Sequence, residues 1–242
     1  MPLDPEHKLY TEAFVGGGAL LFAKEPPKVE VINDLNDDLI TFYRVAQATP
    51  QALISMVQGT LHSHSTHKQA REILLHSDAH TALERAWTVW VCSAQSYASK
   101  LDGTFGYDRS GSTTRKVSNK VSVFTEELLA RLRNLTIESE DALKCIARYD
   151  CPVAFHFVDP PYVGGNCGHY ANMFSDEDFQ NLLKLLSGLS GKFMLTMFPN
   201  ETLSEFTEAN NWHVTEVTRT ISAASASHRR KQVELIVTNY EV

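Results

Sequence analysis

The chain has 242 residues, and it lacks any apolar run long enough to cross a membrane as a helix. A spanning helix needs roughly 18 or more consecutive apolar residues, and no segment approaches that length. Residues 1–6 have neither the basic stretch nor the apolar stretch of a secretion signal. The four cysteines show no Cys-x-x-Cys or other metal-binding spacing, so we expect reduced thiols and no metal ion. These absences predict a cytoplasmic protein without a membrane segment.

Positive charge is also scarce, since the formal net charge is −7. A nucleic-acid partner favours positive charge, so the sum by itself argues mildly against one. The basic residues are concentrated, however, in residues 100–124, which carry five positive and two negative side chains, and in residues 228–231. An acidic body with two basic segments is compatible with DNA binding through those segments, and equally with solvated loops.

The glycine pattern excludes two common nucleotide-binding motifs. Gly16-Gly17-Gly18 follow a candidate strand at residues 10–15, but the Gly-Lys-Ser/Thr ending of a phosphate-binding loop is missing. Leu21 stands where a dinucleotide-binding fingerprint needs a small residue. Asp34 directly follows the next candidate strand, at residues 29–33. Rossmann-like folds place a carboxylate at this position, where it binds ribose hydroxyls. A cofactor with a ribose and no pyrophosphate fits this pattern, and S-adenosylmethionine is such a cofactor.

Hydrophobic periodicity predicts an α/β fold with a helical insertion. Five further candidate strands follow the two above, at residues 135–138, 153–158, 193–198, 213–221 and 232–240. A hairpin-like loop joins the last two, whereas helical segments separate most of the others. We therefore expect a seven-stranded, mostly parallel sheet with an antiparallel last strand, and a mainly helical segment between its parts.

The sequence Asp159-Pro160-Pro161-Tyr162 directly follows the candidate strand at residues 153–158. Ligands of open α/β sheets bind at the carboxyl edge, where this motif would place a carboxylate, a rigid backbone and an aromatic ring together. The Asp159 carboxylate and the Pro160 carbonyl are two acceptors for the protons of one amino group. Tyr162 offers a face on which a planar ring can stack. The alternative interpretation is a plain turn after a strand.

This set of groups suits the methylation of an exocyclic amine. The lone pair of an adenine amino group is delocalised into the ring, which makes the nitrogen a weak nucleophile. Two acceptors that hold its protons favour a pyramidal nitrogen, whose lone pair can attack a methyl sulfonium in line. Because this amine is buried in a duplex, the base has to be flipped out and held against an aromatic face.

With these residues in view, the chain resembles the Dam-type, D12 class DNA adenine-N6 methyltransferases, especially the phage and prophage members, over nearly its whole length. Glu12-Ala13-Phe14-Val15-Gly16-Gly17-Gly18 resembles the family's cofactor motif, Asn33-Asp34-Leu35-Asn36 its ribose-binding element, and Glu140-Asp141-Ala142-Leu143 the element before the catalytic strand. Gln95-Ser96-Tyr97 and Asp102-Gly103 resemble the target-recognition insertion, and Arg229-Arg230-Lys231 with Glu234-Leu235 the C-terminal hairpin. Several motifs in the right order are far more specific than any single one.

The resemblance implies a Rossmann-like, S-adenosylmethionine-dependent enzyme that methylates adenine N6 in double-stranded DNA, in a bacterial or phage-infected cell. It assigns residues 1–50 and 125–242 to the catalytic domain and residues 51–124 to a mainly helical target-recognition insertion. The implied catalytic residues are Asp159, Pro160, Pro161 and Tyr162. The implied cofactor-binding residues are Glu12, Phe14, Gly16, Gly18, Asp34 and Asp141. The implied DNA-binding residues are Tyr107, Arg109, Arg115, Lys116, Arg229, Arg230 and Lys231.

One departure from the family keeps alternatives open. Family members usually have a Gly-Gly-Lys segment well before the glycine motif, and the residues before Tyr10 contain none. A weakly active or inactive DNA-binding relative is therefore one alternative, and an RNA adenine methyltransferase of the same fold is another. Protein glutamine methyltransferases typically carry Asn in place of Asp159, which disfavours that substrate. We expect a monomer or a weak dimer.

Overall fold

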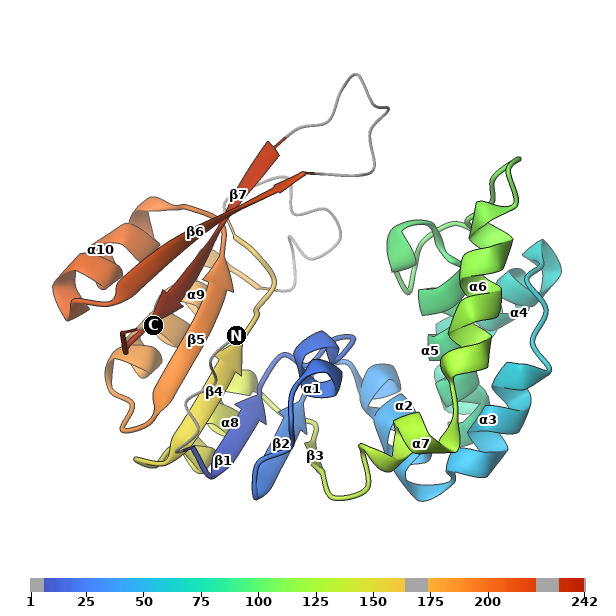
Figure 1. The fold of residues 1–242 in the computed structure, drawn as a ribbon, viewed down its shortest axis with the longest axis horizontal. Coiled ribbons are helices and arrows are strands. Elements are labelled where there is room, and N and C mark those ends of the chain that lie inside the picture. Colours follow the sequence, from blue (N-terminus) through green and yellow to red (C-terminus); the bar gives the residue numbers. More distant parts are fainter. Residues whose placement is uncertain (1–6, 164–173, 221–230, 242) are drawn as a thin grey trace. The chain divides into compact units, whose positions relative to one another are not determined.

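The computed structural model describes residues 7–163, 174–220 and 231–241, which form two compact units (Figure 1). The first unit lies within residues 1–35 and 140–242, and the second comprises residues 36–139. The second unit extends beyond the insertion expected at residues 51–124. The reason is packing, since the flanking helices α2 (Asp37–Ala48) and α7 (Glu126–Ala130) contact its other helices.

Among the described residues, seven strands form one sheet in the order β3-β2-β1-β4-β5-β7-β6. The strands are β1 (Leu9–Glu12), β2 (Val29–Asn33), β3 (Thr136–Glu138), β4 (Ala154–Val158), β5 (Lys192–Met197), β6 (His213–Thr220) and β7 (Lys231–Thr238). Strand β1 is parallel to β2 and β4, and β4 is parallel to β5. Strand β7 is antiparallel to both β5 and β6. The expected seven-stranded, mostly parallel sheet with an antiparallel last strand is confirmed.

One face of this sheet is covered by α8 (Ala142–Tyr149), α9 (Asp176–Ser187) and α10 (Glu201–Asn210) (Figure 1). Successive strand side chains point to opposite faces, so Val158, Leu195 and Val237 reach this core while their neighbours do not. They are fully buried with Phe179 and Leu182 of α9. Burying each aliphatic side chain stabilises the fold by about 1.5–3 kcal/mol.

Local sequence sets where helices begin. Helix α9 starts with a capping box, in which the Ser175 side chain accepts the Asp178 N–H and the Asp178 carboxylate accepts the Ser175 N–H. Thr125 similarly caps α7 by accepting the N–H of Leu128. Ser175-Asp176-Glu177-Asp178 and Thr125-Glu126-Glu127 are both sequence patterns typical of a helix start. The short helix α1 (Ala19–Ala23) follows Gly18, whose left-handed conformation turns the chain out of the glycine loop.

The second unit is built around α5. Its helices are α2, α3 (Pro50–Gln58), α4 (His64–Leu75), α5 (Ala82–Gln95), α6 (Ser112–Val123) and α7, with 3-10 turns η1 (Ser77–Ala79) and η2 (Tyr97–Ser99). Helix α5 contacts α2, α3, α4 and α6, and Trp87 and Trp90 on it are buried. Both tryptophans therefore pack in the core of this unit.

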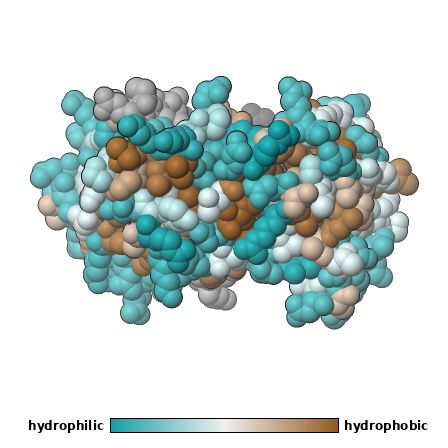
Figure 2. All heavy atoms as spheres, turned by 90° about the horizontal axis from the view of Figure 1, so that it is seen from below, coloured by the Kyte–Doolittle hydropathy of each residue, from teal (hydrophilic) through white to brown (hydrophobic). Residues whose placement is uncertain are grey.

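The surface carries no large continuous apolar area on the face seen in Figure 2. Hydrophilic side chains cover most of that face, and apolar side chains gather in separate patches between them. Within the described part of the chain, no helix is both long and apolar enough to cross a membrane.

Candidate active site

The carboxylate of Asp159 is oriented by the neighbouring strand. Val158 pairs with Leu195 across β4 and β5, so the residues that follow, Asp159 and Thr196, come side by side at the carboxyl edge of the sheet. The hydroxyl of Thr196 donates a hydrogen bond to Oδ1 of Asp159, which is itself exposed. This bond fixes the direction of a carboxylate that solvent and a ligand can both reach.

The ring of Tyr162 is held on two sides. Its hydroxyl donates a hydrogen bond to Oε1 of Glu234, a buried residue of β7. Its ring meets the ring of Phe198, just after β5, edge to face, with centroids 4.4 Å apart and planes at 84°. Burial raises the pKa of the Tyr162 hydroxyl, and the negative charge of Asp159 and the bond to Glu234 add to the increase. Tyr162 is therefore a neutral hydrogen-bond donor, and its ring stays half-buried beside Asp159.

Glu12 ends β1 as a buried carboxylate, 1% exposed. A buried charge is costly unless it is hydrogen-bonded, and the Tyr10 hydroxyl donates to Glu12 Oε1 at 2.7 Å. The ammonium of Lys24 lies 3.8 Å from the centre of the Tyr10 ring and pairs with the buried Glu30. Glu12 pairs with Phe157 of β4, so the chain after β1 is next to the chain that carries Asp159.

The glycine loop after β1 is tied to Asp34 after β2. The Gly16 N–H donates to Oδ2 of Asp34 at 3.1 Å. Gly16 and Gly18 have φ of 47° and 63°, a left-handed conformation that glycine adopts without a side-chain penalty. A Cβ at Gly16 or Gly17 would meet nothing within 4 Å, so there is open space beside the loop.

Two other predicted cofactor residues border the same edge. Asp141 is exposed at the start of α8, where its Oδ1 accepts the Lys144 N–H at 3.1 Å. Phe14 packs edge to face on Phe174, with ring centroids 5.8 Å apart. The structure thus brings the loop Glu12–Gly18, Asp34 and Asp141 to the edge that also carries Asp159 and Tyr162, all within the first unit.

The predicted DNA-binding residues fall in different parts of the chain. Tyr107 is 77% exposed and stacks on Phe105, while Arg109, Arg115 and Lys116 are exposed in the second unit. Lys231 is exposed at the start of β7, and Arg229 and Arg230 lie outside the described residues. The basic residues of the second unit are thus solvent-accessible, with Arg115 and Lys116 on α6.

Three histidines surround Phe105 beside Tyr107. The rings of His62, His64 and His67 lie 4.9, 5.5 and 5.7 Å from the Phe105 ring. His62 also hydrogen-bonds the Gly106 carbonyl at 3.1 Å through Nε2 and the Thr114 hydroxyl at 3.0 Å through Nδ1. His62 therefore fastens the segment before Tyr107 to α6.

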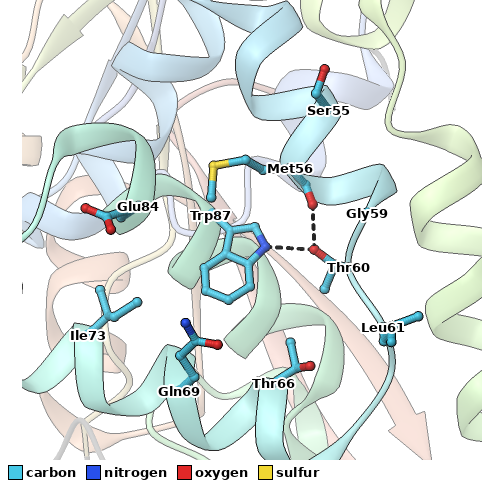
Figure 3. Close-up of a pocket in the computed structure, with 10 residues that line it drawn as sticks. All are labelled: Ser55, Met56, Gly59, Thr60, Leu61, Thr66, Gln69, Ile73, Glu84 and Trp87. Atoms are coloured by element: carbon cyan, nitrogen blue, oxygen red, sulfur yellow. Dashed lines mark hydrogen bonds between the residues drawn. The ribbon is translucent and has the colours of Figure 1, made fainter.

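A pocket of about 420 Å³ lies elsewhere, between α3, α4 and α5 of the second unit (Figure 3). On its wall the Trp87 indole N–H donates to the Thr60 hydroxyl, which donates to the Met56 carbonyl, both at 2.7 Å. None of the predicted site residues lines this pocket. It is therefore separate from the edge that carries Asp159.

The sequence reasoning did not single out Thr196 or Phe198, and it named Asn33 and Glu234 only as members of motifs, without a role for either side chain. Thr196 and Glu234 are polar residues inside otherwise apolar strands, and a polar residue at such a position needs a hydrogen-bond partner. That signal was readable in the sequence, but it does not say which partner is used.

Comparison with known proteins identifies the family. Residues 1–221 match the family described as D12 class N6 adenine-specific DNA methyltransferase. A curated relative, type II methyltransferase M1.LlaDCHI of Lactococcus lactis subsp. cremoris, is 29% identical over 258 residues, which cover 99% of this chain and 88% of the relative. A solved structure of precorrin 8W decarboxylase from Methanobacterium thermoautotrophicum aligns with 96% of this chain and 81% of its own. The identity is 11% and the TM-score 0.39, which is too distant a likeness to indicate a shared function. Because the match extends over most of its length, the chain belongs to the D12 class N6 adenine-specific DNA methyltransferases, which use S-adenosylmethionine.

Proposed function

We propose that this chain flips an adenine out of double-stranded DNA and methylates its N6 nitrogen between Asp159 and Tyr162. The observation that carries this proposal is that both side chains are held, side by side, by residues of neighbouring strands. Thr196 orients the Asp159 carboxylate, and Glu234 with Phe198 orients the Tyr162 ring. An acceptor and a stacking face in fixed positions are what a flipped adenine requires.

The residues at the edge match the donors of S-adenosylmethionine. Its ammonium, ribose hydroxyls and adenine amine are hydrogen-bond donors, and Glu12, Asp34 and Asp141 are three carboxylates at the ends of or just after β1, β2 and β3. We assign these acids to the three donors in that order. Phe14 would pack on the cofactor, and the glycine loop would let the backbone approach it. When bound, the cofactor supplies an electrophilic methyl group.

Catalysis by these residues is mainly positioning. Asp159 and the Pro160 carbonyl would each accept a hydrogen bond from the N6 amino group, and Pro161 stiffens the turn. The N6 lone pair would then face the methyl group that the bound cofactor supplies, and the proton that N6 loses on methylation would leave to Asp159 or to solvent. Tyr162 stacks on the base, and its raised pKa keeps its hydroxyl protonated throughout.

DNA contact is assigned to exposed residues of both units, and to Arg229 and Arg230, which lie outside the described residues. Arg115, Lys116 and Lys231, together with Arg229 and Arg230, are proposed to contact phosphates. Tyr107 and Arg109 are proposed to contact bases. Sequence-independent phosphate contacts would provide most of the affinity, whereas base contacts would determine the target sequence.

A methyl-transfer assay with labelled cofactor tests the proposal. Wild-type protein should label unmethylated double-stranded DNA, and sequencing of that DNA should locate N6-methyladenine at defined sites. Labelling of RNA in place of DNA would support the RNA alternative. DNA and cofactor binding without transfer would support an inactive DNA-binding relative. A phage or prophage source, a cytoplasmic location and a monomer or weak dimer remain predictions.

A further inference from the structure

We propose that Asn33 is a positioning residue that fixes two walls of the S-adenosylmethionine pocket at once. The inference rests on the proposed function, which places the cofactor between the loop after β1 and the turn before α8. Asn33 is the last residue of β2, and its side chain is 0% exposed. It therefore acts on a ligand only through the residues that it holds.

Every hydrogen-bonding group of the Asn33 amide is used. Its Nδ2 donates to the Ala13 carbonyl and to the Glu140 carbonyl, both at 3.0 Å. Its Oδ1 accepts the Glu140 N–H, also at 3.0 Å. In addition, the backbone carbonyl of Asn33 accepts the Val15 N–H at 2.9 Å. One residue thus joins two segments that are far from each other in sequence.

The residues next to these anchor points are the ones assigned to the cofactor. Ala13 stands between Glu12 and Phe14, and Glu140 directly precedes Asp141. The amide therefore sets the distance between the loop proposed to hold the methionine part and the carboxylate proposed to hold the adenine. The next residue, Asp34, accepts the Gly16 N–H, so the end of β2 holds the loop at three places, Ala13, Val15 and Gly16.

The chemistry of the site requires asparagine in particular. Aspartate lacks the two donor hydrogens of the asparagine amide. Its negative charge would therefore lie about 3 Å from two carbonyl oxygens, with no hydrogen bond to either of them. Asn33→Asp should therefore disturb the pocket more than Asn33→Ala, although aspartate has nearly the same shape. A role in filling space alone predicts the opposite order.

Asn239 provides a matched control at the other edge of the same sheet. Its Nδ2 donates to the Gly191 carbonyl at 3.0 Å, and its Oδ1 accepts the Phe193 N–H at 2.9 Å. Both partners lie at the amino end of β5, whereas the cofactor loops follow carboxyl ends. Variants of Asn239 should lower thermal stability without changing cofactor affinity.

The experiment measures cofactor Kd by calorimetry, and kcat and KM by methyl transfer, for the Ala and Asp variants of both asparagines. Asn33→Ala should raise Kd and KM for S-adenosylmethionine on the order of tenfold, which corresponds to about 1.4 kcal/mol of lost positioning. Asn33→Asp should raise them further, and kcat at saturating cofactor should change little in both. A wild-type Kd in Asn33→Ala, or an equal loss in Asn239→Ala, would overturn the proposal.

A second measurement does not depend on the variants folding. In the wild-type protein, saturating S-adenosylmethionine should slow hydrogen exchange at the Val15 and Glu140 amides more than at the Phe193 amide. Unchanged exchange at Val15 and Glu140 would overturn the proposal. Asp34→Ala and Asp141→Ala distinguish a failure of the proposed cofactor pocket from a failure of the proposed role of Asn33. If both bind cofactor normally, the pocket assignment fails, whereas weak binding in them with normal binding in Asn33→Ala removes only the role of Asn33.

Discussion

The hydroxyl of Tyr162, after β4, reaches across the sheet to the carboxylate of Glu234 on β7. Strand β5 lies between these two strands, and Phe198 at its end supports the Tyr162 ring from the side. The ring proposed to stack on the flipped base is therefore oriented before the base arrives. A prearranged side chain loses less conformational entropy on binding, which favours the complex.

Tyr162→Phe keeps the ring and removes its hydrogen bond to Glu234. We expect the single-turnover rate to fall roughly 10- to 150-fold, corresponding to about 1.5–3 kcal/mol for one hydrogen bond to a charged group. Glu234→Gln should give a loss of similar size, and the double variant should lose little more than either single variant. Fully additive losses would show that the two residues act independently.

Asp159→Ala should abolish methyl transfer and leave cofactor affinity largely unchanged, because the carboxylate is assigned to the target amine. Thr196→Val should have a smaller effect, on the order of tenfold in rate, since it removes only the bond that orients Asp159. Thr215→Val on the exposed surface of β6 is the control. Single-turnover rates near the wild-type value in Asp159→Ala would remove this residue from the mechanism.

Asp34→Ala should weaken S-adenosylmethionine binding by roughly 1.5–3 kcal/mol, if it holds the ribose through charge-assisted hydrogen bonds. Asp37→Ala removes an equal charge three residues later and should leave affinity unchanged, because Asp37 pairs with Arg85 in the second unit. Calorimetry measures both. Equal affinities for the wild type and Asp34→Ala would show that the ribose assignment is wrong.

Salt dependence tests the proposed binding of DNA phosphates. Log affinity should fall with log salt concentration, and each phosphate contact that is lost should make this slope shallower by about 0.9. The variants to measure are Lys116→Ala, Arg115→Ala and an Arg230/Lys231 double variant. Lys184→Ala on α9 should leave the slope unchanged. Substitution of Tyr107 or Arg109 should instead change which sequences are methylated. A double variant with wild-type affinity and slope would exclude Arg230 and Lys231 as phosphate-binding residues.

Stability should fall in mild acid because of His156. Burial lowers the pKa of this histidine below 6.5, and the Asp150 carboxylate, 3.5 Å away, opposes that only in part. Below pH 6.5 the unfolded chain binds a proton that the folded chain does not. The free energy of unfolding should therefore decrease as the pH falls from 6.5, by up to about 1.4 kcal/mol per pH unit.

Urea unfolding at pH 7.5 and pH 5.5 measures this effect. Buried His67 contributes in the same direction, since burial, Arg71 and His64 lower its pKa. His156→Gln should therefore reduce the pH dependence without removing it, and His76→Gln, on the surface, should not alter it. An unaltered pH dependence in His156→Gln would contradict the expectation.

Strands and helix starts that depend on neighbouring residues could be predicted from the sequence. Hydrogen bonds between residues far apart in the chain could not, because they depend on how the strands pair. Strand β2 occupies the predicted residues 29–33, because alternating β-branched residues end there at polar ones. Ser175 and Thr125 likewise mark helix starts through bonds to nearby residues. The bonds from Tyr162 to Glu234 and from Asn33 to Glu140 instead join residues 72 and 107 positions apart. Such pairs depend on which strands become neighbours, and the local patterns of a sequence do not show the order of the strands.

The reversed direction of β7 has a consequence for synthesis of the protein on the ribosome. Because β7 is antiparallel to β5, its amino end lies at the carboxyl edge of β5, and Glu234 is therefore next to Tyr162. Of these residues, Glu234 is translated last. A nascent chain that stops before residue 231 contains the whole motif but not the group that holds its tyrosine. Competence for methylation should therefore arrive with the last strand, and a fragment ending before β7 should regain activity when residues 231–241 are supplied as a separate peptide.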